Sequence, residues 1–161
     1  WTSGHHGSEG DIAGRIESRI GLQAEACLFR ADTDLFTAIA AEKSAGPLDA
    51  VFIDEAQFLS HEQVWQLARV SDRLGLPVLC YGLRTDFQGQ LFEGSATLLA
   101  LADDLREART ICHCGRKATM TARVGQGGQV QKHGDQIRVE KAEYISLCRR
   151  HWDDVYGHEE S

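Results

Sequence analysis

The sequence predicts a two-part α/β protein, with a parallel sheet and flanking helices over residues 1–105 and a small β-rich metal-binding domain over residues 106–161. Two observations lead to this prediction. A strand, a helix and a second strand follow one another between Asp49 and Tyr81, which is the βαβ pattern of neighbouring parallel strands. From about residue 106 the pattern changes to short β-like segments, bracketed by Cys112-His113-Cys114 and Cys148-Arg149-Arg150-His151.

The first elements differ in how clearly they are marked. The first 21 residues are rich in Gly, Ser and His and show no clear period, so we expect a loop or a partly ordered tail. A helix is predicted from Asp32, because apolar residues then recur on one helical face: Leu35, Phe36, Ile39 and Ala40. The run Asp49–Ile53 follows and is typical of a buried strand.

The next helix has a marked start and a marked end. Ser60-His61-Glu62-Gln63 has the form of a capping box, and apolar or small residues follow at helical spacing: Val64, Leu67, Ala68, Ser71 and Leu74. Gly75 predicts the C-terminal end, with Pro77 just beyond it. We expect the next strand over Pro77–Tyr81 and a further helix over Ala96–Asp103.

The second part is predicted to contain four short β-like segments: Ala108–Ile111, Ala118–Val124, Gln136–Val139 and Glu143–Leu147. A glycine-rich stretch, Gly125-Gln126-Gly127-Gly128-Gln129, predicts a turn between them.

Composition excludes some classes of protein. The 161 residues are 42% apolar and 25% charged, which is ordinary for a globular protein. The net charge of −7 disfavours nucleic-acid binding, and no apolar run approaches the roughly 20 residues that span a bilayer. Five cysteines, an odd number, indicate a reducing cytoplasm better than a disulfide scaffold. Cys27 and Cys80 lie in apolar runs, where we expect small buried side chains.

The two Cys/His clusters predict a structural zinc site. C-x-C followed by C-x-x-H offers thiolate and imidazole ligands for Zn²⁺, and four protein ligands close the site. The alternative is four separate residues without a metal; C-x-C is tighter than the usual ligand spacing, and iron–sulfur ligation would more often use four cysteines. Zinc would tie the ends of the intervening segment into a loop.

Asp54 and Glu55 follow the strand that ends at Ile53, where ligands bind in open α/β sheets. Asp54 there could hold Mg²⁺ with phosphate oxygens as further ligands. Glu55 would face elsewhere, because side chains alternate along a strand, and could deprotonate a hydroxyl. A solvated strand end explains the acidic pair equally well.

The stretch Gly82–Phe92 follows a parallel strand, where functional loops lie. Phe87 and Phe92 could form the wall of a pocket for a flat base. Ordinary contacts beneath a loop are the favoured explanation from this pattern alone.

Four motifs in order, VFIDEAQFLS, PVLCYGLRTDFQGQLFEGS, TICHCGRKATMTARV and YISLCRRHW, strongly resemble the zinc-containing (type II) thymidine kinase family, and its bacterial branch in the C-x-x-H cluster. The resemblance runs from about Ser18 to Trp152. It implies a P-loop-type parallel sheet with flanking helices, and a zinc domain whose lasso loop closes over thymidine. It also implies transfer of the γ-phosphoryl group of ATP, with Mg²⁺, to the 5′-hydroxyl of thymidine.

The resemblance also implies roles for individual residues. Glu55 matches the general base, and the nucleotide- and Mg-binding segment matches Asp54, Glu55, Ala56 and Gln57. Positions that line the thymidine pocket match Phe58, Leu83, Phe87, Phe92 and Thr121, and Tyr144 matches the aromatic residue at the end of the lasso. The zinc ligands match Cys112, Cys114, Cys148 and His151. Family members are typically homotetramers, and many are inhibited by dTTP.

The sequence departs from the family pattern in three places. It contains no G-x-x-x-x-G-K-S/T phosphate loop, and Gly4–Gly14 lacks the Gly-Lys pair, so we expect the family's N-terminal strand and helix to be missing from this chain. The stretch Ile137–Glu140 lacks the glycine pair common before the final tyrosine; Ile137 and Val139 are our choices for its thymidine contacts. No phosphate-binding arginine is assigned, Arg19 and Arg84 being weak candidates.

Two alternatives remain open besides the kinase. One is a nucleoside-binding or assembly protein derived from the kinase, and an intact Gly-Lys-Ser/Thr segment would decide against it. The other is a zinc-ribbon module that binds protein or nucleic acid, against which the acidic charge speaks.

Overall fold

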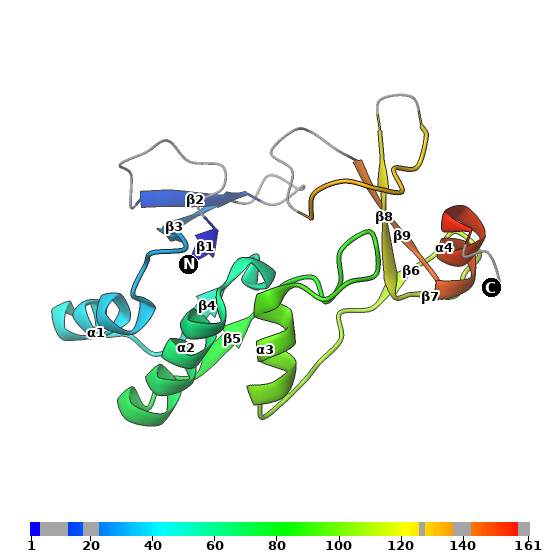
Figure 1. Ribbon diagram of the computed structural model, residues 1–161. Coiled ribbons are helices and arrows are strands. Elements are labelled where there is room, and N and C mark those ends of the chain that lie inside the picture. The colour runs from blue at the N-terminus through cyan, green and yellow to red at the C-terminus, as the bar shows by residue number, and fades with distance from the viewer. Residues whose placement is uncertain (4–12, 18–22, 126–127, 137–142, 158–161) are drawn as a thin grey trace. The chain divides into compact units, whose positions relative to one another are not determined.

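The computed structural model describes residues 1–3, 13–17, 23–125, 128–136 and 143–157 (Figure 1). The chain forms two compact units. The first contains residues 1–84 and 92–102, and the second contains residues 85–91 and 103–161. Both helices and strands occur, and the strands form small sheets, so the protein is of mixed α/β class.

The sheet of the first unit begins with strands that the sequence pattern did not predict. β1 (Thr2–Ser3) pairs in parallel with β3 (Gln23–Phe29), and β2 (Ala13–Glu17) pairs with β3 in antiparallel orientation. The expectation of a loop or tail over residues 1–21 is therefore wrong at β1 and β2. Thr2–Ser3 is too short and Ala13–Glu17 contains one large apolar side chain, Ile16, so neither shows an alternating pattern, and both strands form by backbone pairing with β3.

A parallel pair of strands continues this sheet. β4 (Val51–Ile53) and β5 (Val78–Cys80) are parallel, with Ile53 opposite Cys80, as the βαβ pattern predicted. The backbone N of Trp1 donates to the carbonyl of Phe52, and the amide of Asp54 donates to the carbonyl of Trp1, both at 2.8 Å. These two bonds flank Ile53 in the manner of a parallel ladder, so they place β1 beside β4.

Two predicted helices form, although the one predicted from Asp32 begins three residues later, at Leu35. α1 (Leu35–Ala45) begins after Asp34, whose side chain accepts a hydrogen bond from the amide of Thr37. α2 (His61–Leu74) begins with the predicted capping box between Ser60 and Gln63. Its C-cap, Gly75, has a φ of 64°, the left-handed conformation expected at such an end.

α3 (Glu93–Leu101) begins three residues before the predicted helix and ends two residues before its predicted end. Its first turn passes very close to the 3-10 helix η2 (Ala56–Phe58). A Cβ on Gly94 would lie 2.6 Å from the carbonyl oxygen of Ala56 and 2.8 Å from that of Leu59. This backbone approach admits only glycine, and periodicity does not reveal it.

The core of the first unit lies between the helices and the sheet. α2 contacts α1, α3 and β5, and in Figure 1 it is drawn across β4 and β5. The core consists of Phe29, Leu35, Ile39, Val51, Ile53, Ala56, Leu59, Val64, Leu67, Val70 and Leu76. Phe52, between two buried residues of β4, is 55% exposed, so the described helices cover one face of this strand.

The described part of the second unit contains two antiparallel strand pairs and a helix. β6 (Thr110–Ile111) pairs with β7 (Lys117–Ala118), and β8 (Met120–Val124) pairs with β9 (Glu143–Leu147), both antiparallel. β9 has the predicted bounds. The predicted strand over 118–124 is divided between two strands, because Ala118 pairs with β6 whereas Met120–Val124 pair with β9.

The last helix, α4 (Arg149–Tyr156), was not predicted. Of the predicted strand Gln136–Val139, Gln136 lies in a bend and the other residues lie outside the described ranges. The core of this unit consists of Cys112, Ala118, Ala122, Leu147, Cys148 and Trp152. Within the described ranges, no helix has the length and apolar character needed to cross a membrane.

Candidate functional site

The acidic pair Asp54-Glu55 lies in a tight turn. β4 ends at Ile53, and Glu55 has φ 55° and ψ 37°, the left-handed conformation that is rare outside glycine. The expectation that strand alternation separates the two carboxylates is therefore wrong, and the turn separates them instead. A left-handed residue other than glycine costs roughly 1–2 kcal/mol, and such strain concentrates at functional sites.

Gln57 holds the side chain of Glu55. Its Nε2 donates to Oε2 of Glu55, and its Oε1 accepts the amide of Leu83 at 3.0 Å. Gln57 is only 3% exposed, whereas Glu55 is exposed. A buried amide that uses both ends in this way fixes the carboxylate relative to the segment after β5.

Gly82 allows this arrangement. A Cβ at Gly82 would lie 2.5 Å from Oε1 of Gln57 and 2.9 Å from its backbone nitrogen. Tyr81, just before it, accepts the amide of Ala56 at 2.8 Å. The ends of the two parallel strands are therefore joined at the acidic turn, where open α/β sheets bind their ligands.

Three of the predicted pocket residues lie in the same unit as the acidic turn. The rings of Phe58 and Phe92 meet edge to face, with centroids 5.8 Å apart. Leu83, 45% exposed, is held through its carbonyl by the hydroxyl of Ser95 at 2.6 Å.

The second unit brings the four predicted metal ligands together. The ligand atoms of Cys112, Cys114, Cys148 and His151 all lie within 4.8 Å of one another. Sγ of Cys112 lies 3.3 Å from Nδ1 of His151, and Sγ of Cys114 lies 3.9 Å from Sγ of Cys148. These separations suit tetrahedral ligands around one ion, and three thiolates with one imidazole favour Zn²⁺.

Local structure explains why these side chains converge. Cys112 and Cys114 lie in the turn between β6 and β7, where Gly115 donates its amide to the carbonyl of Cys112. Cys148 is the N-cap of α4, so the first helical turn places His151 on the same side. The first turn of α4, a helix that was not predicted, thus brings Cys148 and His151 of the C-x-x-H motif close enough to bind one ion.

The thiol of Cys112 is poised to ionise. Burial alone would raise its pKa, but hydrogen bonds from the amides of Cys114 and Cys148 and from the side chains of His151 and Cys114 lower the pKa to about 5. Thiolate is the form that binds metal. By contrast, burial raises the pKa of Cys80 to about 11, and Cys27 and Cys80 are half-buried, less than expected.

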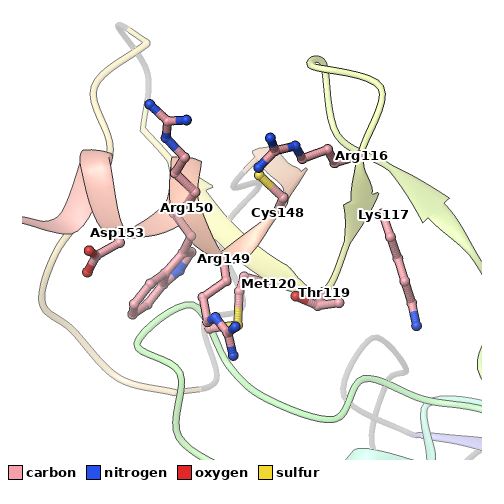
Figure 2. A pocket seen from close by; sticks show the side chains of 9 residues that line it. Arg116, Lys117, Thr119, Met120, Cys148, Arg149, Arg150 and Asp153 are labelled. Carbon is pink, nitrogen blue, oxygen red and sulfur yellow. The ribbon is translucent and has the colours of Figure 1, made fainter.

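Basic side chains line a hollow beside one member of the metal-ligand cluster, Cys148. Figure 2 shows a hollow beside Cys148 that is lined by Arg116, Lys117, Arg149 and Arg150. Lys117 pairs with Glu107. The arginines point in different directions in Figure 2. A Zn²⁺ ion with three thiolates carries a net negative charge, which these cations would offset.

The other predicted pocket residues lie in the second unit. Trp152 donates its indole N–H to the carbonyls of Phe87, at 3.2 Å, and Thr121, at 3.1 Å. Tyr144 on β9 is 46% exposed. Ile137, Val139 and Arg19 lie outside the described residues. Trp152 directly follows the candidate ligand His151, so one helix turn carries a candidate metal ligand and the indole that donates to two predicted pocket residues.

The sequence reasoning missed three residues that organise this unit: Trp152, Asp86 and Arg123. Asp86 is 4% exposed and accepts the amides of Gln88 and Gln90, which shapes the loop 85–91. Arg123 is 1% exposed. An arginine within the otherwise uncharged predicted strand Ala118–Val124 was the available signal, since a buried charge needs specific partners.

Fold and site together define an α/β protein with an acidic turn at the ends of parallel strands and a Cys₃His cluster that could hold a metal such as zinc. The profile of the family described as thymidine kinase matches residues 5–152. The chain is 57% identical over 157 residues to a thymidine kinase of Mesorhizobium japonicum, covering 98% of this chain and 76% of that protein.

Two further relatives agree. A thymidine kinase of Rhizobium meliloti is 61% identical over 144 residues, covering 88% of this chain and 74% of that protein. A thymidine kinase of Vibrio vulnificus is 54% identical over 145 residues, covering 89% of this chain and 76% of that protein. This chain belongs to the thymidine kinase family.

Proposed function

We propose that this protein transfers the γ-phosphoryl group of ATP to the 5′-hydroxyl of thymidine, giving dTMP. Its family consists of kinases. The observation that carries the proposal is the acidic turn, in which a strained, exposed Glu55 is held by the buried Gln57 beside Leu83. A carboxylate fixed at the ends of parallel strands is suited to receive a proton from a bound hydroxyl.

Glu55 is proposed as the general base and Asp54 as the residue associated with Mg²⁺. Oδ1 of Asp54 accepts the amide of Glu55 at 3.0 Å, which orients one carboxylate oxygen and leaves the other for a metal or a metal-bound water. Mg²⁺ would supply charge neutralisation to the phosphates of ATP. Ala56 and Gln57 complete the proposed nucleotide-binding segment.

Thymidine is proposed to bind through the residues that match the family's pocket. Phe58, Leu83 and Phe92 offer apolar surface near the acidic turn, and the remaining pocket matches are Phe87, Thr121 and Tyr144. Flat apolar walls with a few fixed polar groups are the chemistry of a base pocket. The backbone at Ile137 and Val139, in the proposed lasso, would add hydrogen bonds to the base.

The remaining proposals concern the whole protein. The bonds of Trp1 to Phe52 and Asp54 join the strands in the order β2-β3-β1-β4-β5, in which β3–β1, β1–β4 and β4–β5 are parallel pairs. This order supports a P-loop-type nucleotide-binding domain followed by a zinc domain. Five free cysteines support a reducing cytoplasm. A homotetramer and inhibition by dTTP rest on the family resemblance alone.

The test is Mg-ATP-dependent phosphorylation of thymidine, with thymidine binding measured separately by calorimetry on the same zinc-loaded sample. We expect both binding and formation of dTMP. Binding without product would reduce the proposal to a nucleoside-binding protein. A folded, zinc-loaded protein that does not bind thymidine would overturn it.

A further inference from the structure

Arg123 is a buried cation whose guanidinium contacts an aromatic ring with its face and backbone carbonyls with its edge. It lies on β8, in register with Tyr144 of β9, and is 1% exposed. Among the described residues no carboxylate forms an ion pair with it. A buried arginine without a counter-charge is costly, so its other contacts must hold it in place.

The guanidinium face covers the ring of Phe87. Its central carbon lies 3.7 Å from the ring centroid, a close cation–π contact. The carbonyl of Phe87 is at the same time bound by the indole of Trp152. Phe87 is therefore held at its backbone and at its ring, and it is 1% exposed.

The edge of the same guanidinium binds a different segment. Nη2 donates to the carbonyl of Asp135 at 2.6 Å and approaches that of Gln136 at 3.5 Å. Gln136 in turn donates from Nε2 to Oδ2 of Asp86 at 3.0 Å. The same Nε2 also donates to the carbonyl of Leu91 at 3.3 Å, so the loop 85–91 and the residues 135–136 are joined both through Arg123 and through the side chain of Gln136.

Arg123 contacts both flanks of the sequence segment that carries Ile137 and Val139. Asp135 and Gln136 precede this segment, and Tyr144, whose ring centroid lies 6.0 Å from the guanidinium carbon, follows it. Nε of Arg123 is buried and has no hydrogen-bond partner among the described residues. The side chain tolerates this unpaired donor while its other groups remain engaged.

We propose that Arg123 is a positioning residue for thymidine: it sets the ring of Phe87 and the backbone at 135–136 in the relative places that the nucleoside requires. This inference rests on the proposed function. Arg123 itself is 1% exposed, so it acts through the Phe87 ring and through the backbone at 135–136. Lysine cannot replace it, because an ammonium has no planar fork to lie on a ring and donate sideways to a carbonyl.

The experiment measures thymidine binding and steady-state kinetics of Arg123→Met and Arg123→Lys, with Arg109→Met as the control. Arg109 is an exposed arginine of the same unit. We expect both Arg123 variants to raise the Kd and KM for thymidine by roughly 10- to 100-fold, the scale of a misplaced binding group. The KM for ATP, the zinc content and the control variant should stay within about twofold of wild type.

Phe87→Leu separates positioning from general support of the fold. Because Arg123 acts through Phe87 as well as through the backbone at 135–136, Arg123→Lys should raise the thymidine Kd by a smaller factor in the Phe87→Leu background than in the wild type. Should Arg123→Met fail to fold, Arg123→Lys and this double-mutant cycle decide the question. An unchanged thymidine Kd in Arg123→Lys would overturn the inference. An equally large effect of Arg123→Lys on the thymidine Kd in the Phe87→Leu background would overturn it too. Absence of thymidine binding by the wild type would instead remove the proposed function and the inference with it.

Discussion

At the scale of single residues, Glu55 is held in a conformation that its own chemistry disfavours. Its left-handed backbone is maintained by neighbours: the amide of Ala56 bonds to Tyr81, and Gln57 binds the Glu55 carboxylate. Gly82 is required for this approach, because a Cβ there would collide with Gln57. The surrounding backbone therefore over-determines the position of one carboxylate, which is how strain persists at a site.

Glu55→Gln should abolish most turnover while thymidine still binds. The amide keeps the size of the side chain but cannot accept the proton, and loss of a general base costs on the order of 10²–10⁴ in kcat. Steady-state kinetics and calorimetric titration with thymidine check this. Glu62→Gln, an exposed glutamate on α2 paired with Arg69, is the matched control. Unchanged kcat in Glu55→Gln would remove Glu55 as the base.

At the scale of elements, the sequence marks some boundaries and not others. The capping box at Ser60, the stop at Gly75 and the parallel pairing of β4 with β5 were all predictable, because each depends on residues close in the chain. β2 and α4 were not. β2 owes its existence to pairing with β3, and α4 contains a single buried residue, Trp152, so it offers too short an apolar period.

The contact between α3 and η2 depends on Gly94. Gly94→Ala should lower the free energy of unfolding by about 1–3 kcal/mol, because the new methyl meets backbone carbonyls that cannot rotate away. Urea denaturation measures the change. Gly46→Ala is the control, since a Cβ at Gly46 would meet no atom within 4 Å and the backbone there is extended. Equal stability of the two variants would contradict the close approach.

At the scale of the whole molecule, the metal-ligand cluster organises the second unit. Cys112 and Cys148 belong both to the cluster and to the apolar core, and Trp152 extends that core to the carbonyls of Phe87 and Thr121. A bound ion would therefore stabilise the unit and brace two proposed thymidine contacts together. Binding energy of a structural metal is folding energy in such a small unit.

Cys148→Ser should lose the metal, lower the Tm of the second unit and weaken thymidine binding, because α4 and Trp152 lose their anchor. Metal analysis by mass spectrometry, thermal unfolding and thymidine titration check the three consequences. Cys27→Ala removes a free cysteine of the first unit and should change none of them. If the wild-type protein had the same Tm with and without bound metal, a structural zinc site would be contradicted.

The sequence by itself determined the ligands of the candidate metal site, the βαβ order, the helix caps and the family, because local spacing and linear motifs carry them. Only the tertiary structure decided the turn that holds Glu55, the clasp of Gln57 and Gly82, and the burial of Arg123 against Phe87. The Gln57–Glu55 bond is local, but the contacts of Gln57 with residues 82–83 and of Arg123 with Phe87 join residues far apart in the chain. Their geometry follows from how the elements pack, which no local period records.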